Sequence, residues 1–406
     1  MEKVVQACGG DLHSLVLVKS GKVYSMGQNN HGQLGLGNCK EKLVPHLINP
    51  KHFNFEKIVQ ICAKHYYSMA LTQKGNVYCW GNGRYGGLGL GNKLRCKFPQ
   101  QIDSKHFNNE HIEYIECGHS YSSFAVSKNN KIYSWGCNYS GQLGLGNEID
   151  QSTPQLVNLN HHERVIKVCC GINFTLLLIE SGNIWSCGNN KSGQLGLGHN
   201  INKTSFECID NNAFEYVDSS NDNIFKIDEI KDIVSGQVHC LALTESGKIY
   251  SWGNNNYGQL GLKNNIQQNL PQLILPSCFQ NEDIVDIGCG NFHSIAIAKK
   301  QKCTSGNSIV YSCGLDLNNP ILSKMKLKFT KINQRYSKEK FIVSKGGLCD
   351  SFFLTKSGKL FVYGDNLSFQ CGIETRKSRV NKFTKINFNG KIIDIATGVF
   401  HSIFLV

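Results

Sequence analysis

The chain has 406 residues, of which 40% are hydrophobic and 18% are charged, and its formal net charge is +13. No apolar run is long enough for a membrane-spanning helix and no secretory signal opens the chain, so we expect neither a membrane span nor export. Its 18 cysteines lie largely in apolar stretches such as "KVCCG", where thiols behave as small hydrophobic groups. The sequence therefore predicts a reducing compartment, cytoplasm or nucleus, rather than a disulfide framework.

One phrase recurs along the chain and opens as "VVQACGGDLHSLVLV" at Val4. Full copies begin near residues 4, 58, 112, 165, 230, 284 and 341, and a half-repeat covers 392–406. Most copies continue through a turn such as Ser20-Gly21 into a second apolar run, "KVYSMG". Short runs of branched and aromatic residues on both sides of such a turn are typical of β-hairpins. Repeats of this length indicate propellers, solenoids or arrays.

A glycine-rich phrase, "SWGCNYSGQLGLGN" at 134–147, follows the hairpin in five of the repeats. We interpret it as a sharp turn that Leu143 and Trp135 wedge between neighbouring sheets. The candidate turn glycines are Gly32, Gly35, Gly86, Gly89, Gly141, Gly144, Gly193, Gly196, Gly258 and Gly261. The alternative is a phosphate cradle, because "GNGRYG" from Gly81 matches a dinucleotide-binding pattern. No helix is expected after it, so the dipole that holds a pyrophosphate is missing.

These patterns predict an all-β fold: a seven-bladed β-propeller of four-stranded antiparallel blades. We expect one domain over 1–406 with a long acidic insertion at 200–229. The first phrase occurs eight times but the second strand of its hairpin only seven times, which leaves one redundant half-repeat at a chain end. That half-repeat is either a flap or a partial eighth blade. If residues 1–18 are the redundant copy, deleting them should barely lower the melting temperature.

Histidines recur in the pattern "GxxHS" as His13, His239, His293 and His401. In the other copies we assign the same place to Tyr67, Tyr121, Phe174 and Asp350. Neither a metal site nor a catalytic base tolerates that mixture, so we interpret the histidines as groups that fix the blades by hydrogen bonds to the backbone. The sequence predicts no catalytic residue, no metal site and no cofactor.

The phrases "GKVYSMGQNNHGQLGLGN" and "CGNFHSIAI" resemble those of the regulator of chromosome condensation family, over essentially residues 4–406. That resemblance implies a seven-bladed propeller. The family's founding member is a guanine-nucleotide exchange factor for the small GTPase Ran and docks on chromatin. The positions implicated in exchange correspond here to Asn30, Asn173 and Phe292, where the family member has two acidic residues and a histidine. Neutral residues at all three places favour a protein-binding scaffold over exchange activity.

Two basic patches are candidate partner-binding sites: Lys324, Lys326 and Lys328, and Arg376, Lys377 and Arg379. The alternative interpretation is a charged strand edge that prevents sheets from pairing between molecules. Other candidate contact segments are the acidic spacer Asn202–Glu229 and the loop Lys299–Ser308. Because the spacer is acidic, we do not expect direct binding to nucleic acid or chromatin.

We therefore predict a monomeric, non-enzymatic scaffold or adaptor that binds protein partners. The first alternative is a divergent exchange factor for a Ran-like GTPase, possible partners then including chromatin. The second is an adaptor in ubiquitin ligation or ciliary trafficking, where propellers of this family recur.

Overall fold

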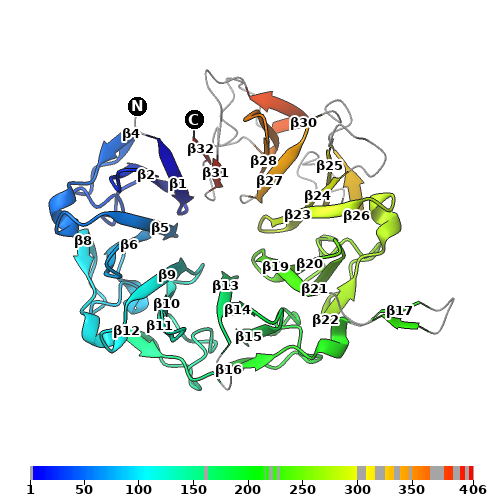
Figure 1. Cartoon of the computed structure of the whole chain (residues 1–406), viewed down its shortest axis with the longest axis horizontal. Helices are drawn as coiled ribbons and strands as arrows, with labels where there is room; N and C mark the ends of the chain where they lie inside the picture. The colour runs from blue at the N-terminus through cyan, green and yellow to red at the C-terminus, as the bar shows by residue number, and fades with distance from the viewer. Residues whose placement is uncertain are drawn as a thin grey trace.

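The computed structural model describes residues 3–159, 163–214, 216–218, 223–225, 229–299, 308–315, 325–332, 339–346, 350–365, 379–386, 394–397 and 402–405. Seven four-stranded antiparallel sheets are arranged around a central axis as the blades of a β-propeller (Figure 1). In these segments every helical element is a short 3-10 turn, and no helix in them is both long and apolar enough to cross a membrane. The all-β fold predicted from the repeat is confirmed.

Each blade uses four consecutive strands, ordered from the axis outward. Blade 1 contains β1 (Val4–Gly9), β2 (His13–Val18), β3 (Val23–Gly27) and β4 (Lys42–Leu47), and blade 2 contains β5 (Ile58–Lys64), β6 (Tyr67–Thr72), β7 (Val77–Gly81) and β8 (Cys96–Gln101). Blade 3 contains β9 (Ile112–Cys117), β10 (Ser122–Ser127), β11 (Ile132–Gly136) and β12 (Gln151–Leu156), and blade 4 contains β13 (Val165–Cys170), β14 (Phe174–Ile179), β15 (Ile184–Gly188) and β16 (Lys203–Cys208). Blade 5 contains β19 (Ile230–Ser235), β20 (His239–Thr244), β21 (Ile249–Gly253) and β22 (Gln268–Leu273). Blade 6 contains β23 (Asp283–Cys289), β24 (His293–Lys299), β25 (Ser308–Leu315) and β26 (Met325–Lys331), and blade 7 contains β27 (Phe341–Gly346), β28 (Asp350–Thr355), β29 (Leu360–Asp365) and β30 (Arg379–Ile386).

Smaller elements complete the ring. The 3-10 turns are η1 (Pro50–Phe53), η2 (Arg84–Gly86), η3 (Ser104–Phe107), η4 (Asn211–Phe214) and η5 (Pro276–Phe279). A hairpin of β17 (Tyr216–Asp218) and β18 (Asn223–Phe225) lies within the predicted acidic insertion, and β17 projects away from the ring in Figure 1.

The core lies between blades rather than within them. The second strand of a blade packs against both neighbouring blades, which is why β14, with the sequence FTLLLI, is buried at every position. Across one interface Met69 and Leu71 of β6 join the same apolar cluster as Ile112 and Ile115 of β9. Burying apolar surface on both sides of a sheet stabilises the ring by roughly 25 cal/mol per Å². Every blade therefore depends on its neighbours for its core.

The redundant half-repeat is the one at the C-terminal end. The N-terminal copy supplies β1 and β2, which pair with β3 and β4 to complete blade 1. The C-terminal copy forms a separate two-stranded sheet, β31 (Asp394–Thr397) with β32 (Ser402–Leu405). This sheet lies between β1 and β27 (Figure 1). It is a partial eighth blade, and the hypothesis that residues 1–18 are redundant is wrong.

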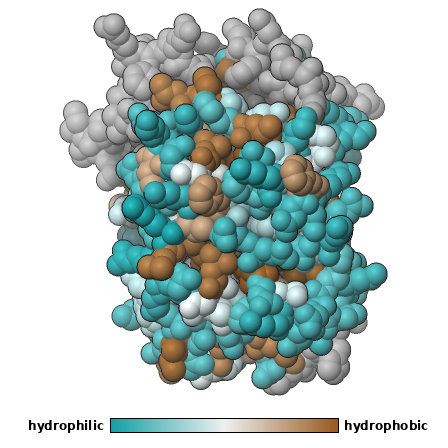
Figure 2. Space-filling model, turned by 90° about the vertical axis from the view of Figure 1, so that its left-hand side faces the viewer, coloured by the Kyte–Doolittle hydropathy of each residue, from teal (hydrophilic) through white to brown (hydrophobic). Residues whose placement is uncertain are grey.

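The outer strands expose apolar side chains at the rim. On the side that carries β4 and β8, apolar residues are scattered among hydrophilic ones (Figure 2). Leu43 of β4 is 89% exposed and Phe98 of β8 is 40% exposed. Both strands contain a proline, Pro45 and Pro99. A proline cannot donate a backbone hydrogen bond, so it hinders a further strand from pairing with these edges.

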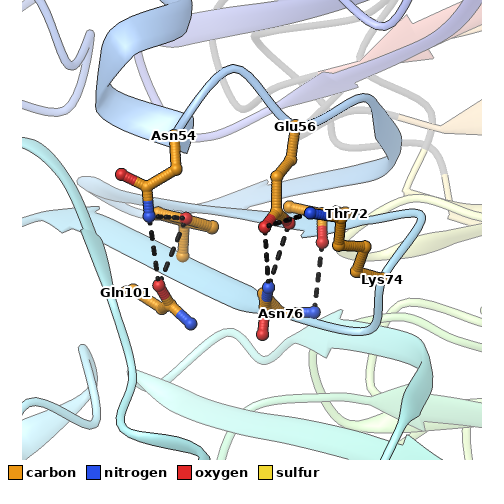
Figure 3. Close-up of polar contacts among 7 residues, drawn as sticks. Asn54, Glu56, Thr72, Lys74, Asn76 and Gln101 are labelled. Carbon is orange, nitrogen blue, oxygen red and sulfur yellow. Dashed lines mark hydrogen bonds and ion pairs between the residues drawn. The ribbon is translucent and has the colours of Figure 1, made fainter.

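A polar staple joins the linker before blade 2 to the turn between β6 and β7 (Figure 3). The carboxylate of Glu56 accepts hydrogen bonds from the side-chain amide of Asn76 at 3.0 and 3.1 Å. The ammonium of Lys74 lies 3.5 Å from the same carboxylate. Burial acts to raise the pKa of Glu56, but hydrogen bonds from Asn76 and Thr72 and the charge of Lys74 outweigh burial and leave this pKa lowered. The staple therefore holds an ionised carboxylate at neutral pH.

Candidate protein-binding face

Two kinds of loop emerge at one end of the ring. Strand direction alternates along each blade, so the loop after the first strand and the loop after the third strand leave the sheet at the same end. We call this end the loop face; it consists of residues 10–12, 28–41, 65–66, 82–95, 118–121, 137–150, 171–173, 189–202, 236–238, 254–267 and 290–292. The glycine-rich phrase forms the loop after the third strand. The loop face is thus formed by the segments of the repeat that contain the sequence motifs.

A buried asparagine fixes four of the five glycine-rich loops; in the loop of blade 2 its place is taken by Gly83. In blade 3 the side-chain amide of Asn138 donates to the carbonyl oxygens of Asn147 at 2.8 Å and Ile149 at 3.2 Å. Its Oδ1 accepts from the backbone N–H of Leu143 at 2.9 Å, and Ser134 donates to the Leu143 carbonyl at 2.8 Å. Equivalent bonds surround Asn29, Asn190 and Asn255. These polar side chains are occupied in holding the loop, which leaves its tip as a rigid platform.

The candidate turn glycines lie against the next blade. All ten have φ between 70° and 81°, a region that costs energy for any residue with a Cβ. A Cβ at Gly35 would lie 2.9 Å from the indole Nε1 of Trp80. That indole N–H donates to the carbonyl oxygen of Gln33 at 2.8 Å, and Trp135 and Trp252 make the same kind of bond. Gly35, Gly89 and Gly196 leave the space that the tryptophan of the next blade fills.

The repeated histidine links one blade to the next. His13 Nε2 lies 2.9 Å from Ser68 Oγ in blade 2, and Ser68 donates to the carbonyl oxygen of Gln33. His239 reaches Ser294 at 3.0 Å and His293 reaches Ser351 at 2.8 Å in the same way. The motif histidines thus connect the blades, but the partners of these bonds are serine hydroxyls of the next blade rather than the backbone groups that were predicted. His401 lies outside the described residues.

The assignment of Tyr121 to the histidine place is wrong. The place is defined by pairing with the last glycine of the third strand, as His13 pairs with Gly27. In blade 3 the residue opposite Gly136 is Ser122. Its first loop is one residue longer than that of blade 1, which moves Tyr121 out of the sheet and onto the loop face.

Aromatic side chains pair across blade boundaries on the loop face. In three places a ring in the glycine-rich loop of one blade meets a ring in the first loop of the next: His31 with Tyr66 at 5.1 Å, Tyr85 with Tyr121 at 6.0 Å, and Tyr257 with Phe292 at 5.4 Å between ring centroids. At the fourth place Tyr139, 54% exposed, lies next to Asn173. We call the three ring pairs, together with Tyr139 and Asn173, the aromatic ladder. Half-exposed aromatic rings held by neighbours are typical anchors of protein interfaces.

Charged groups accompany the ladder at blades 2 and 3. His65 stacks on Tyr121 with a centroid distance of 5.1 Å, and its Nδ1 lies 2.9 Å from an Asp11 carboxylate oxygen. The exposed Arg84 guanidinium lies 4.7 Å from the centroid of Tyr85. Burial and, to a smaller extent, the Asp11 carboxylate raise the pKa of Tyr121 to about 12, so its hydroxyl stays protonated. This sector offers aromatic surface, one cation and hydrogen-bonding groups side by side.

Neutral imidazoles add to the aromatic character of this sector. Burial and the Arg95 cation lower the pKa of His31. Burial, Lys64 and His65 lower the pKa of His119 well below its usual value. Both rings are therefore uncharged at neutral pH.

The structure places the three exchange-related positions on the loop face but far apart around it. Asn30 is exposed in the glycine-rich loop of blade 1. Asn173 and Phe292 lie in the first loops of blades 4 and 6, where both belong to the aromatic ladder. They do not form one compact cluster.

The described residues of the basic patches lie on outer strands. Lys326 and Lys328 belong to β26, the outer strand of blade 6, and Arg379 begins β30. Lys326 Nζ lies 5.2 Å from the ring centroid of Tyr363 and 3.3 Å from its hydroxyl. Lys324, Arg376 and Lys377 lie outside the described residues, as do 300–307 of the predicted contact loop and 215, 219–222 and 226–228 of the acidic spacer.

Comparisons with known proteins agree with the fold. The model of the RCC1-like domain family matches residues 1–316 and 111–404. The chain is similar to the ultraviolet-B receptor UVR8 of Arabidopsis thaliana, with 32% identity over 272 residues, which is 67% of this chain and 58% of the receptor. It is also 32% identical to the probable E3 ubiquitin-protein ligase HERC6 of Homo sapiens over 72% of this chain but only 27% of that protein. The chain thus spans less than two thirds of these relatives.

Solved structures are similar over nearly the whole chain. Prp20p of Saccharomyces cerevisiae has a TM-score of 0.70 at 21% identity and covers 99% of this chain and 92% of its own. Human WBSCR16 has a TM-score of 0.66 at 19% identity, with coverage of 100% and 87%. At these identities the likeness concerns the fold.

Proposed function

Because this chain belongs to the RCC1-like domain family, we propose that it is a protein-binding scaffold whose loop face contacts the partner. The aromatic ladder carries this proposal. Its rings are positioned by neighbouring blades, so little conformational entropy is lost when a partner covers them. The motif residues next to it hold the loops in place.

The sector at blades 2 and 3 is the proposed centre of the interface. Tyr139 and Arg84 are exposed, and tyrosine and arginine are enriched among residues that dominate binding energy. Around them, the half-buried Tyr85 supplies apolar surface and packs on the ring of Tyr121, which is buried. A protein partner with apolar side chains flanked by acidic groups fits this combination.

The second candidate is an exchange factor for a Ran-like GTPase. It is favoured by the likeness to Prp20p, whose structure is described with its binding to Gsp1p and histones. Against it, Phe292 packs on Tyr257, and Asn173 is a neutral residue next to Tyr139. Displacing a bound nucleotide and its Mg²⁺ favours charged groups directed at the phosphate site, and these three positions supply none.

Release of labelled GDP from Ran separates the two candidates. We expect the protein at sub-micromolar concentration to leave the release rate at its spontaneous value, whereas removal of Mg²⁺ with a chelator, as the positive control, should accelerate release. Acceleration by orders of magnitude, abolished by changing Asn30 and Asn173 to alanine, would establish the exchange factor instead.

A photoreceptor role like that of UVR8 has no support in the tryptophans. Trp80, Trp135 and Trp252 are fully buried and lie in three different blades, each bonded to a backbone carbonyl of the preceding blade. These three tryptophans stabilise the interfaces between neighbouring blades.

A further inference from the structure

A central channel of about 340 Å³ runs between the inner strands of the blades. Six cysteines contribute to its wall: Cys8, Cys62, Cys117, Cys169, Cys170 and Cys289. Among the described residues, no three histidine, cysteine, aspartate or glutamate side chains converge as a metal-binding group. The thiols are distributed along different strands, so their pairwise distances decide what they can do.

The repeat brings two particular positions together at the boundary between blades. In β5, Cys62 faces β9 of the next blade, and its Sγ lies 2.8 Å from Sγ of Cys117. In β13, Cys169 holds the place of Cys62, and its Sγ lies 3.2 Å from Oγ of Ser235 in β19, which holds the place of Cys117. The close approach is thus produced by the fold and recurs at a second interface.

Whether two thiols meet at a blade boundary depends on which residues occupy the two corresponding places. At the boundary between blades 1 and 2 the corresponding residues are Cys8 and Ala63, and between blades 3 and 4 they are Glu116 and Cys170. Only the boundary of blades 2 and 3 has a thiol at both places among these interfaces. A small shift of two side chains brings their sulfur atoms to bonding distance, which is about 2.05 Å in a disulfide.

We propose that Cys62 and Cys117 are a site of reversible disulfide formation that links the inner strands of blades 2 and 3. The oxidant is a hydroperoxide small enough to enter the channel. One thiolate attacks the peroxide oxygen, which gives a sulfenic acid and releases water or an alcohol after proton transfer. The second thiol then displaces the hydroxyl group as water, so two thiols and one hydrogen peroxide give one disulfide and two waters. Dithiol reductants restore both thiols.

The surroundings make this reaction slow near neutral pH and faster in alkali. Burial, followed by the hydrogen bond and charge of Cys117, raises the pKa of the Cys62 thiol, and Glu116 of β9 and Cys8 of β1 act in the same direction. Lys64, on the same strand as Cys62, has its ammonium 3.5 Å from His119 of β9. Because the thiolate is the attacking species, the rate should rise as the pH approaches that raised pKa.

The test is mass spectrometry of the folded wild-type chain. The protein is treated with excess hydrogen peroxide at mildly alkaline pH, its remaining thiols are alkylated, and it is digested without reductant. We expect one major cross-linked species that joins the peptides of Cys62 and Cys117 and disappears on treatment with dithiothreitol. Recovery of both cysteines as free thiols or as sulfinic acids, or a major cross-link between other cysteines, would overturn the proposal.

Three variants provide matched controls. Cys8→Ser removes another thiol of the channel wall and should leave the cross-link unchanged, whereas Cys62→Ser should abolish it. Ser235→Cys places a second thiol opposite Cys169 in the same geometry, and peroxide should then produce a second cross-link between those two residues. Absence of that second cross-link in a folded variant would show that the shared geometry does not support disulfide formation.

Discussion

The glycines of the repeated phrase differ in what surrounds them, and a comparison of Gly89 with Gly91 in blade 2 makes this difference measurable. Both Gly89 and Gly91 have positive φ, 70° and 78°. A Cβ on Gly89 would lie 2.8 Å from the indole Nε1 of Trp135 and 2.9 Å from Ile102, whereas a Cβ on Gly91 would find only Thr153 at 3.8 Å. Backbone strain is common to both positions, and collision with the next blade belongs to Gly89 alone.

We therefore expect Gly91→Ala to lower the free energy of unfolding by about 1 kcal/mol, for backbone strain alone. Gly89→Ala should lower it by about 3 kcal/mol or more, because the Trp135 ring must also move. Chemical denaturation of both variants checks this. Equal losses would mean that the glycine is needed only for its φ.

The buried histidines give stability a defined dependence on pH. Burial and the neighbouring His293 lower the pKa of His239 to about 3, and burial and Lys326 lower that of His293 to about 4. In the unfolded chain a histidine has a pKa of about 6.5. Below that pH the unfolded chain binds protons that the folded chain does not, so stability should fall as the pH drops from about 6.5 towards 4, and not above 6.5.

His239→Gln should flatten this dependence, since glutamine does not titrate while its amide can still reach Ser294. The measurement is the melting temperature as a function of pH for the wild type and the variant. An unchanged slope between pH 6.5 and 4 would show that His239 does not contribute to it.

The sequence predicted what is periodic and missed what depends on contacts between repeats. Strands, turn glycines and blade number follow from residues that recur at fixed places. The displacement of Tyr121 was missed because one additional residue in a loop changes no pattern. The aromatic ladder was missed because His31 and Tyr85 directly precede the loop glycine whereas Tyr139 lies one place earlier. Glu56, Glu110 and Glu339 recur before the first strand and hold lysines, and an alignment of the repeats alone could have found them.

At the scale of strands, glutamine side chains join neighbouring inner strands. Gln60 of β5 donates to the carbonyl oxygen of Ile115 in β9 at 2.9 Å and accepts from the backbone N–H of the same residue at 3.0 Å. Gln6 makes the same two bonds to Ile61. Inner strands of different blades are not paired as a sheet, so these side chains satisfy backbone groups at the boundary.

Gln60→Ala should lower the free energy of unfolding by about 1–3 kcal/mol, because two partly buried backbone groups lose their partner. Gln100→Ala, at an exposed position of β8, is the matched control and should change it by less than about 0.5 kcal/mol. Denaturant titration distinguishes the two, and an effect of Gln60→Ala as small as that of the control would contradict the role assigned to the side chain.

The two chain ends should differ in their contribution to stability. Deleting residues 1–18 removes β1 and β2 and leaves half of blade 1, so the melting temperature should collapse or the protein should fail to fold. Deleting 392–406 removes the partial eighth blade and keeps all seven four-stranded sheets, so the loss should be smaller. A larger loss from the C-terminal deletion would show that the partial blade closes the ring.

At the scale of the whole molecule, the ring of blades provides rigidity, and the loop face provides the surface proposed to contact the partner. Each blade obtains its core from its neighbours, and the motif residues fix the loops from below. The loop face exposes the aromatic ring of Tyr139 and the cation of Arg84 together with apolar side chains such as Leu94 and Ile149, whereas Leu43 is exposed at the rim beside Pro45. If the protein is a scaffold, changes on the loop face must matter more than changes at the rim.

The most direct measurement is quantitative affinity capture with three forms of the protein: wild type, the loop-face variant Arg84→Ala with Tyr139→Ala, and the rim variant Leu43→Ser with Val44→Ser. The three forms should have similar melting temperatures, because all four side chains are exposed. The account predicts that partners retained reproducibly by the wild type are lost by the loop-face variant and kept by the rim variant. Retention of the same partners by the loop-face variant, with loss by the rim variant, would contradict it.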